Sequence, residues 1–300
     1  MTSLISKSQR AKALCLAMAF FASTASAEVP RVGIYTSPPR SFSTATYWLE
    51  GAQGVVLIDT QFLPQEGQRA LREAERSTGK KVTTALVLHP NPDKFNGTAL
   101  MQASGVQVFT SAQVASHIPA VHKIRLGWFA QDYQPDYPNE AAKPSVFGER
   151  TVTADWSGVK VKLHVLGPGC SAAHVVAQVD DAVFVGDLIN PDNHAWLELG
   201  LIDDWLRRLD EIKAMTPKRV FPGRGLPGGP ELIERQAEYL RFVQKTVQAD
   251  KPSGSLGWLT KLRLQRAIEG RYPALGYPIF VRDGLEAVWR AEALKAAAPR

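Results

Sequence analysis

One polar stretch of this 300-residue chain brings together side chains that can hold metal ions and activate water: His89, Asn91, Asp93 and Lys94. It follows an apolar run, residues 84–88, that predicts a buried strand, and it precedes an amphipathic segment ending at Gly105. Imidazole and carboxylate groups are the usual protein ligands of catalytic zinc, together with cysteine. Loops that a rigid scaffold positions often carry function. We therefore expect the functional site at this loop.

Four other segments contain a charged residue or a cysteine next to glycine or at the end of an apolar run. They are Val55-Val-Leu-Ile-Asp59-Thr60, Gly167-Pro-Gly-Cys170-Ser171, Val183-Phe-Val-Gly186-Asp187-Leu188 and Phe221-Pro-Gly223-Arg224-Gly225. In order and spacing, the five segments resemble the motifs of the metallo-β-lactamase superfamily, and the resemblance covers most of residues 44–245. It implies an α/β (α+β) fold, a four-layer αββα sandwich in which two sheets pack face to face with helices outside.

The resemblance also implies which residues stand at the metal-ligand positions. At the first metal these are His89, Asn91 and Cys170, and at the second they are Asp93, Lys94 and Arg224. Asp187 stands at the position that bridges both metals, and Asp59 at one that supports the site from behind. Four of the five histidine ligands of the family are therefore replaced, by Asn91, Lys94, Cys170 and Arg224.

The replacements at the second position are cationic. Two unit charges about 4 Å apart at an effective dielectric constant of about 20 interact by about 4 kcal/mol, and a divalent ion roughly doubles that repulsion. Lys94 and Arg224 would instead balance the charges of Asp93 and Asp187. We therefore expect a salt-bridged pocket without metal at this position, in which Asn91, Lys94 and Arg224 line the pocket or bind an anion.

The first position leaves alternatives open. His89, Cys170 and Asp187 supply the three ligands that one catalytic zinc needs. Cys170 could equally be a small buried hydrophobe, or a thiolate nucleophile if Lys94 or Arg224 lowers its pKa. His194, in the loop after Asp187, could approach the site or be exposed. The other histidines, His117, His122, His164 and His174, match no ligand position and are expected to be structural or exposed.

Three functions follow from these residues. The first is a non-hydrolytic protein that binds a small anionic ligand or a periplasmic partner protein in the old active-site cleft, without a cofactor. The second is a mono-zinc hydrolase of an ester, lactone, thioester or lactam, using His89, Cys170 and Asp187, with Asp93 positioning the attacking water. The third is a metal-free enzyme that uses Cys170 or Lys94 covalently.

Residues 1–27 have the pattern of a secretory signal: a basic start, an apolar stretch at 13–22 and the small residues Ala25-Ser-Ala27. They carry three of the basic residues (Lys7, Arg10 and Lys12) and no acidic one, so removing them lowers the formal net charge from +6 to +3. We draw no nucleic-acid partner from so small a charge. Cleavage would leave one cysteine, no disulfide and no stable membrane span, and would place the protein in the periplasm or outside the cell.

The remaining chain divides into a metallo-β-lactamase-like domain, residues 28–250, and a C-terminal helical extension packed on it, residues 251–300. Residues 28–43 are rich in proline and serine and are expected to form an entry segment. Residues 127–148 contain Trp128, Phe129, Tyr133, Tyr137 and three prolines and predict a long surface loop. These aromatic residues would either line a groove or anchor the loop. Elsewhere strands followed by helices predict helix-covered sheets.

Overall fold

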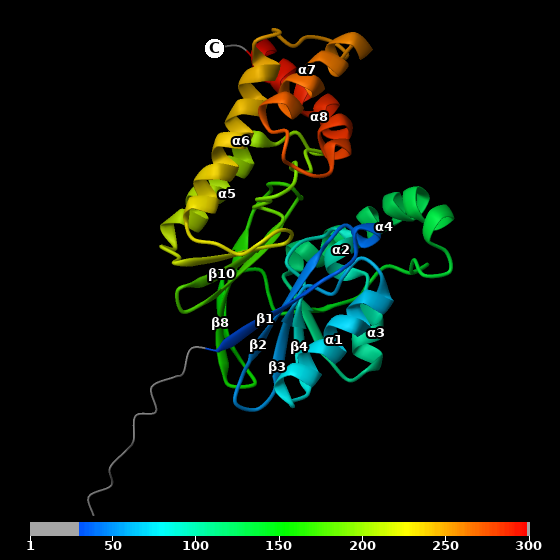
Figure 1. The fold of residues 1–300 in the computed structure, drawn as a ribbon, viewed down its shortest axis with the longest axis vertical. Coiled ribbons are helices and arrows are strands. Elements are labelled where there is room, and N and C mark those ends of the chain that lie inside the picture. The colour runs from blue at the N-terminus through cyan, green and yellow to red at the C-terminus, as the bar shows by residue number, and fades with distance from the viewer. Residues whose placement is uncertain (1–29, 299–300) are drawn as a thin grey trace, which may run out of the picture.

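The computed structural model of the protein describes residues 30–298 and shows two β-sheets with helices on their outer faces (Figure 1). The first sheet has the order β1-β2-β3-β4-β5-β6, with β1 Arg31–Thr36, β2 Ala45–Glu50, β3 Val55–Ile58, β4 Val82–Leu86, β5 Gln107–Thr110 and β6 Ser145–Val146. The second has the order β11-β10-β9-β8-β7, with β7 Val152–Trp156, β8 Val159–Leu166, β9 His174–Val179, β10 Ala182–Gly186 and β11 Arg219–Pro222. The predicted signal, residues 1–27, lies outside the described residues.

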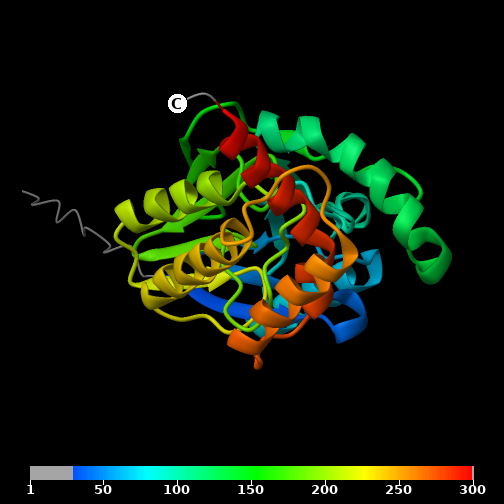
Figure 2. The same cartoon turned by 90° about the horizontal axis from the view of Figure 1, so that it is seen from above.

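Helices from each half of the chain cover the sheet of that half. The first half contributes α1 Pro64–Thr78, α2 Pro92–Phe95, α3 Thr98–Ala103 and α4 Ala112–Tyr133. The second contributes α5 Ile202–Ala214, α6 Glu231–Gln248, α7 Trp258–Arg271 and α8 Pro278–Ala297. Figure 2 shows α5 and α6 side by side over the second sheet, with α7 and α8 next to them. The αββα sandwich predicted from the sequence is confirmed.

Two apolar cores hold these layers together, and β10 contributes to both. Phe184 packs between the sheets, where its ring centroid is 5.5 Å from that of Tyr47 and 4.6 Å from that of Phe221. Val183 and Val185 point the other way and pack under the helices with Trp205. Because side chains alternate across a strand, a strand buried on both faces reads as a continuous apolar run. The second core also includes residues of α7 and α8, among them Leu264, Val281 and Val288.

Several element boundaries follow directly from local chemistry. Pro64 begins α1, as proline favours the first helical position, and Gly79 ends it at φ 69°, with its N–H donating to the Glu75 carbonyl at 2.8 Å. Ser111 caps α4, where its Oγ accepts from the Val114 N–H at 3.2 Å. These start and stop signals are visible in the sequence.

One predicted loop was wrong, and the entry segment contains a strand that was not predicted. Residues 28–43 include β1, an edge strand that pairs antiparallel with β2, from Arg31 opposite Glu50 to Thr36 opposite Ala45. The predicted loop at 127–148 is helical up to Tyr133 because α4 continues past Gly127. Helix α4 has no strongly apolar face of its own to predict this length. Tertiary packing of Phe129 and Tyr133 against Phe62 supports its last turns.

Among the described residues, none of the helices combines the length and the apolar character needed to cross a lipid bilayer.

Candidate functional site

The predicted site residues lie at one edge of the sandwich because the strands that precede them end there. Strands β3 and β4 run parallel in the first sheet, and β10 and β11 run parallel in the second. Residues that directly follow parallel strands lie at the same edge of a sheet, which is where open α/β sheets place their ligands. The five residues brought together in this way are Asp59 after β3, His89 after β4, Cys170 after β8, Asp187 after β10 and Arg224 after β11.

The short helix α2 supplies Asp93 and Lys94. It begins at Pro92, and the Lys94 N–H donates to the Asn91 carbonyl at 2.9 Å. The backbone of Lys94 is fixed from the other side, since its carbonyl accepts from the Thr60 N–H and from Thr60 Oγ1, each at 2.8 Å. The Lys94 side chain is completely buried. Its ammonium group therefore needs partners within the protein, and the carboxylates of the site provide them.

Two cations and two carboxylates form a closed network at the centre of the site. Lys94 Nζ forms ion pairs with Asp93 Oδ2 and with Asp187 Oδ1, each at 2.9 Å, and donates a hydrogen bond to the Gly223 carbonyl at 3.5 Å. Arg224 bridges the same two carboxylates: Nη2 donates to Asp93 Oδ2 at 2.6 Å and Nη1 donates to Asp187 Oδ2. Arg224 Nε donates to the Phe42 carbonyl at 3.0 Å. All four side chains are buried, so the ion pairs are little screened by water.

Gly223 is required for this close approach. A Cβ at this position would lie 2.2 Å from Asp187 Oδ1 and 2.7 Å from Lys94 Nζ. Either distance is far below van der Waals contact. Any side chain at position 223 would therefore displace the Lys94–Asp187 ion pair.

The charges in the network stabilise one another. Burial alone would raise the pKa of Asp187 and of Asp93, but Arg224 and Lys94 outweigh it and hold both carboxyl pKa values below their usual range. Burial would also lower the pKa of the Lys94 ammonium, yet the charges of Asp187 and Asp93 hold it above its usual range. Lys94 is thus a charged, fully paired ammonium, and it lacks the free amine that a covalent mechanism needs.

Asp59 behaves differently from the other two carboxylates. Its Oδ1 accepts from the Leu88 N–H at 2.9 Å, and its Oδ2 lies 3.9 Å from Lys94 Nζ. Burial raises the pKa of Asp59 to about 8, because Lys94 and the Leu88 N–H offset only part of the desolvation. Near neutral pH Asp59 is mostly protonated. The buried centre then holds two positive and two negative charges.

Asp59 should make the protein less stable as the pH rises. Its folded pKa exceeds the value of about 3.9 in an unfolded chain, so the folded state binds the extra proton between roughly pH 4 and pH 8. The free energy of unfolding should fall across that window by up to about 1.4 kcal/mol per pH unit. Asp93 and Asp187 have lowered pKa values, so their contribution is lost only on the acid side of about pH 4.

We expect Asp59→Asn to remove this decline, because asparagine keeps an acceptor for the Leu88 N–H and carries no charge. Urea unfolding at about pH 5 and about pH 8 measures the slope for both proteins. The variant should be the more stable one at the higher pH. If the free energy of unfolding changes equally with pH in both proteins, Asp59 does not titrate in this window.

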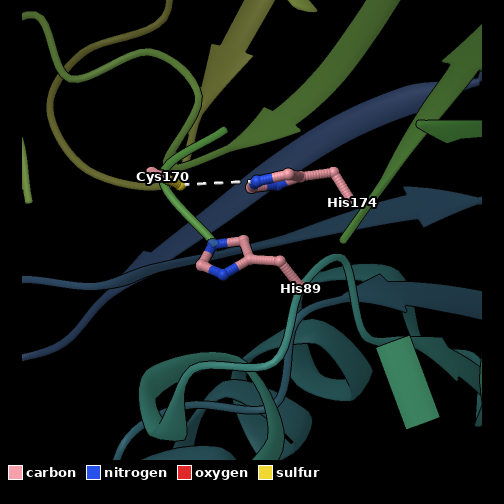
Figure 3. A group of neighbouring side chains, drawn as sticks. All are labelled: His89, Cys170 and His174. Atoms are coloured by element: carbon pink, nitrogen blue, oxygen red, sulfur yellow. Dashed lines mark hydrogen bonds between the residues drawn. The ribbon is translucent and has the colours of Figure 1, made fainter. Parts of the chain in front are cut away.

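The position of the first metal has a different set of neighbours. His89, Cys170 and His174 each place one donor atom within 4.8 Å of the other two, and they form the one group of this kind within residues 30–298 (Figure 3). Cys170 Sγ lies 3.7 Å from His174 Nε2. All three side chains are buried. His174 begins β9, directly after the loop of Cys170, and we had expected it to be structural or exposed.

Three of the four imidazole nitrogens of this group are engaged in hydrogen bonds, and His174 Nδ1 has no partner among the described residues. His89 Nε2 accepts from the Asp187 N–H at 3.3 Å while its Nδ1 lies 3.1 Å from Ser171 Oγ, and His174 Nε2 accepts from the Ser171 N–H at 3.1 Å. Burial, together with the charge of Asp187, raises the pKa of the Cys170 thiol well above its usual value. A thiolate nucleophile at Cys170 is therefore unfavourable.

The structure also places three other histidines, His194, His122 and His164, about which we had expectations from the sequence. His194 neither approaches the site nor is exposed: it is buried, and its Nδ1 lies 3.0 Å from the Tyr239 hydroxyl. His122 is buried beside Phe95 and Tyr137. His164 is half-buried against Gln178, at 2.8 Å. None of these three belongs to the group at Cys170.

An aromatic cleft lies over the ion-paired network. Asn91, Asp93, Asp187 and Arg224 line its base. Its walls include six aromatic side chains, Phe42, Phe62, Trp128, Phe129, Trp196 and Phe280. Trp128 and Phe129 therefore line a groove, while Tyr137 is buried and anchors the segment that follows α4. Sequence reasoning did not identify Phe42, Trp196 or Phe280.

Comparison with known proteins agrees with this arrangement. The profile of the family described as "Metallo-beta-lactamase superfamily" matches residues 40–224, which is more than half of the chain. The chain belongs to the metallo-β-lactamase superfamily. The match begins just before Phe42 and ends at Arg224, so it spans the ion-paired network and the group at Cys170.

Solved structures of the superfamily share the fold at low sequence identity. A metallo-β-lactamase from Pontibacter korlensis has a TM-score of 0.54 at 20% identity, covering 70% of this chain and 94% of its own. One from Hirschia baltica has a TM-score of 0.51 at 21% identity, covering 69% and 90%. The enzyme FIM-1 from Pseudomonas aeruginosa, solved in its mono-zinc form, has a TM-score of 0.54 at 16% identity, covering 70% and 89%.

Zinc, which the superfamily implies, does not fit the second metal position of this chain. The Lys94 ammonium and the Arg224 guanidinium lie between the carboxylates that would bind the ion. At the first position, His89, Cys170 and His174 have the donor types of a zinc site. An ion held by the Nε2 atoms of His89 and His174 would replace the N–H groups of Asp187 and Ser171 there, and binding to Cys170 would remove the proton of a thiol whose pKa is raised.

Proposed function

We propose that this protein is an exported, non-hydrolytic member of the superfamily that binds a small ligand in the aromatic cleft. The main support for this proposal is the position of Lys94 Nζ, which lies 2.9 Å from a carboxylate oxygen of Asp93 and 2.9 Å from one of Asp187. A protein cation there takes the place that a metal ion takes in a hydrolase. Without such an ion no group in the network supplies hydroxide near neutral pH.

The walls of the cleft favour a ligand with a flat apolar part. Phe62 packs edge to face on Phe42 and on Phe129, with centroids 4.9 and 5.1 Å apart, and Trp196 packs on Phe280 at 5.1 Å. Aromatic pairs contribute about 0.5–1.5 kcal/mol beyond the apolar area they bury. An aromatic ring inserted among these side chains would gain contacts of the same kind.

The base of the cleft favours a ligand without a full charge. The anionic ligand predicted from the sequence would meet the cations Lys94 and Arg224, but both already face Asp93 and Asp187. The guanidinium of Arg125, at the rim, is likewise paired with Glu198 and lies 4.0 Å from the centre of the Trp128 ring. A hydroxyl or amide group could bond to Asn91 without opening an ion pair.

Binding can be followed by the fluorescence of Trp128 and Trp196 while benzyl alcohol, benzoate and benzylamine are titrated. We expect benzyl alcohol to bind most tightly, and Trp128→Ala to weaken it about tenfold, equivalent to about 1.4 kcal/mol. Trp258→Ala is the matched control, since this exposed tryptophan lies outside the cleft. If benzoate binds most tightly, the ligand is anionic, as the sequence predicted. Metal-dependent hydrolysis of a panel of esters, lactones, thioesters and β-lactams would refute the proposal.

A second candidate, a mono-zinc hydrolase, is favoured by the proximity of His89, Cys170 and His174. In this case His174 would take the ligand role that the sequence suggested for Asp187, whose carboxylate is held by Arg224 and Lys94. Elemental analysis after incubation with zinc separates the two candidates. About one zinc per chain, lost in both Cys170→Ala and His174→Ala, would establish the hydrolase site. Negligible zinc in the folded chain would support the first proposal, a non-hydrolytic protein that binds a small ligand.

A further inference from the structure

A second cleft lies on the helical side of the molecule, between the loop that follows β10 and the helices α6 and α7. It shares no lining residue with the aromatic cleft. Its lining includes Arg235, Gln236, Glu238, Arg271 and Tyr272. None of them belongs to the ion-paired network or to the group at Cys170.

Gln236 lines this cleft and has a buried hydrogen-bond donor without a partner in the described segment. The residue is 4% exposed, and its Oε1 accepts from the Asn190 N–H at 2.9 Å. That contact fixes the orientation of the amide, because only the oxygen can accept a hydrogen bond. The Nε2 group is then buried with no acceptor within residues 30–298. A buried donor of this kind is normally paired.

Two arginines add positive charge beside this donor. Neither Arg235 nor Arg271 has a carboxylate within 4.0 Å in the described part of the chain. Arg235 Nη2 donates to the Pro191 carbonyl at 3.3 Å, and the Arg271 guanidinium lies 5.2 Å from the centre of the Tyr272 ring. Each guanidinium has five N–H groups, so most donors remain free. Glu238 is the one carboxylate in the lining, and the cleft carries a net positive charge.

We propose that this cleft binds the oxyanion group of a small molecule, a carboxylate or a phosphate. Oxygen acceptors on such a group satisfy the Gln236 amide and take charge-assisted hydrogen bonds from the two guanidinium groups. Arginine is suited to this task because its planar fork matches both oxyanions. The proposal does not depend on the function assigned to the aromatic cleft.

The test is a titration of the full chain with inorganic phosphate and with acetate at constant ionic strength, using chloride as the reference. Binding to the folded state raises Tm in a saturable manner. We expect Arg271→Gln and Arg235→Gln each to raise the apparent Kd about tenfold, through the loss of charge-assisted hydrogen bonds. Arg266→Gln is the matched control, an exposed arginine on the same helix outside the cleft, and should leave the Kd unchanged.

Gln236→Glu provides an independent readout because it keeps the acceptor for the Asn190 N–H and replaces the free donor with an acceptor. Its response to both anions should be lost. Stabilisation by phosphate alone identifies a phosphate group as the ligand chemistry, and stabilisation by both anions includes carboxylates. A Tm that does not respond, or that responds equally in the Arg271→Gln and Arg266→Gln variants, would overturn the proposal.

Discussion

Lys94→Met is expected to lower the free energy of unfolding by about 3–5 kcal/mol, the cost of removing one partner from a buried ion pair. Methionine has a similar length and fills the same buried space. The loss comes from Asp93 and Asp187, which would remain buried with Arg224 as their one close cation. A buried ion pair need not make a protein more stable than an apolar core would, but a buried charge without its partner makes it less stable.

Urea unfolding measures this effect, and Lys213→Met is the control. Lys213 pairs with Glu234 on the protein surface, where ion pairs contribute little, so its replacement should barely change the unfolding curve. Unfolding of Lys94→Met at a pH low enough to protonate both carboxylates should recover part of the difference. Equal stability of the native chain and Lys94→Met near neutral pH would mean that Lys94 does not compensate the two carboxylates.

The double variant Lys94→His with Arg224→His is expected to bind one zinc ion per chain. It replaces both cations with neutral imidazoles next to Asp93 and Asp187, which gives four ligands of the types that zinc prefers. The carboxylates already converge, since Lys94 Nζ touches an oxygen of each at 2.9 Å. The change from a charge-balanced centre to a divalent-ion site is the largest change in ligand affinity that we predict.

Elemental analysis after dialysis against zinc and then against metal-free buffer measures this outcome. Each single histidine variant is a control, because the remaining cation still repels the ion and occupies the carboxylates. Adding Asp187→Asn to the double variant should abolish zinc binding. A folded double variant that retains no zinc would show that the backbone around the network has moved away from a metal-binding geometry.

The sequence predicted the fold because local signals and the order of five motifs agree. Strands β8, β9, β10 and β11 coincide with runs of the sequence rich in apolar residues, and α1 ends at a glycine, Gly79. The ion pairs expected between Lys94, Arg224, Asp93 and Asp187 are all present. The positive and negative residues at the motif positions can be counted in the sequence. Their charge balance can therefore be predicted before any distance is known.

The features that the sequence did not predict depend on segments far apart in the chain. The aromatic cleft draws its walls from the segment after β1, from α4, from the loop before α5 and from α8. His174 approaches His89 only because β9 begins beside the end of β4, where the Val175 N–H donates to the Leu88 carbonyl at 2.6 Å. The last turns of α4 likewise depend on Phe62, which lies on another segment.

The shared carboxylates of the ion-paired network also limit how this centre can change by mutation. Asp93 and Asp187 each touch both Lys94 and Arg224, so the two cations cannot be exchanged independently. A single change to histidine leaves a chain with too few cations to balance the carboxylates and too few ligands to hold a metal ion. Histidine at position 94 alone or at position 224 alone is therefore expected to lower the stability of the chain without creating a metal site. Exchange of both cations is needed to pass between the two kinds of centre.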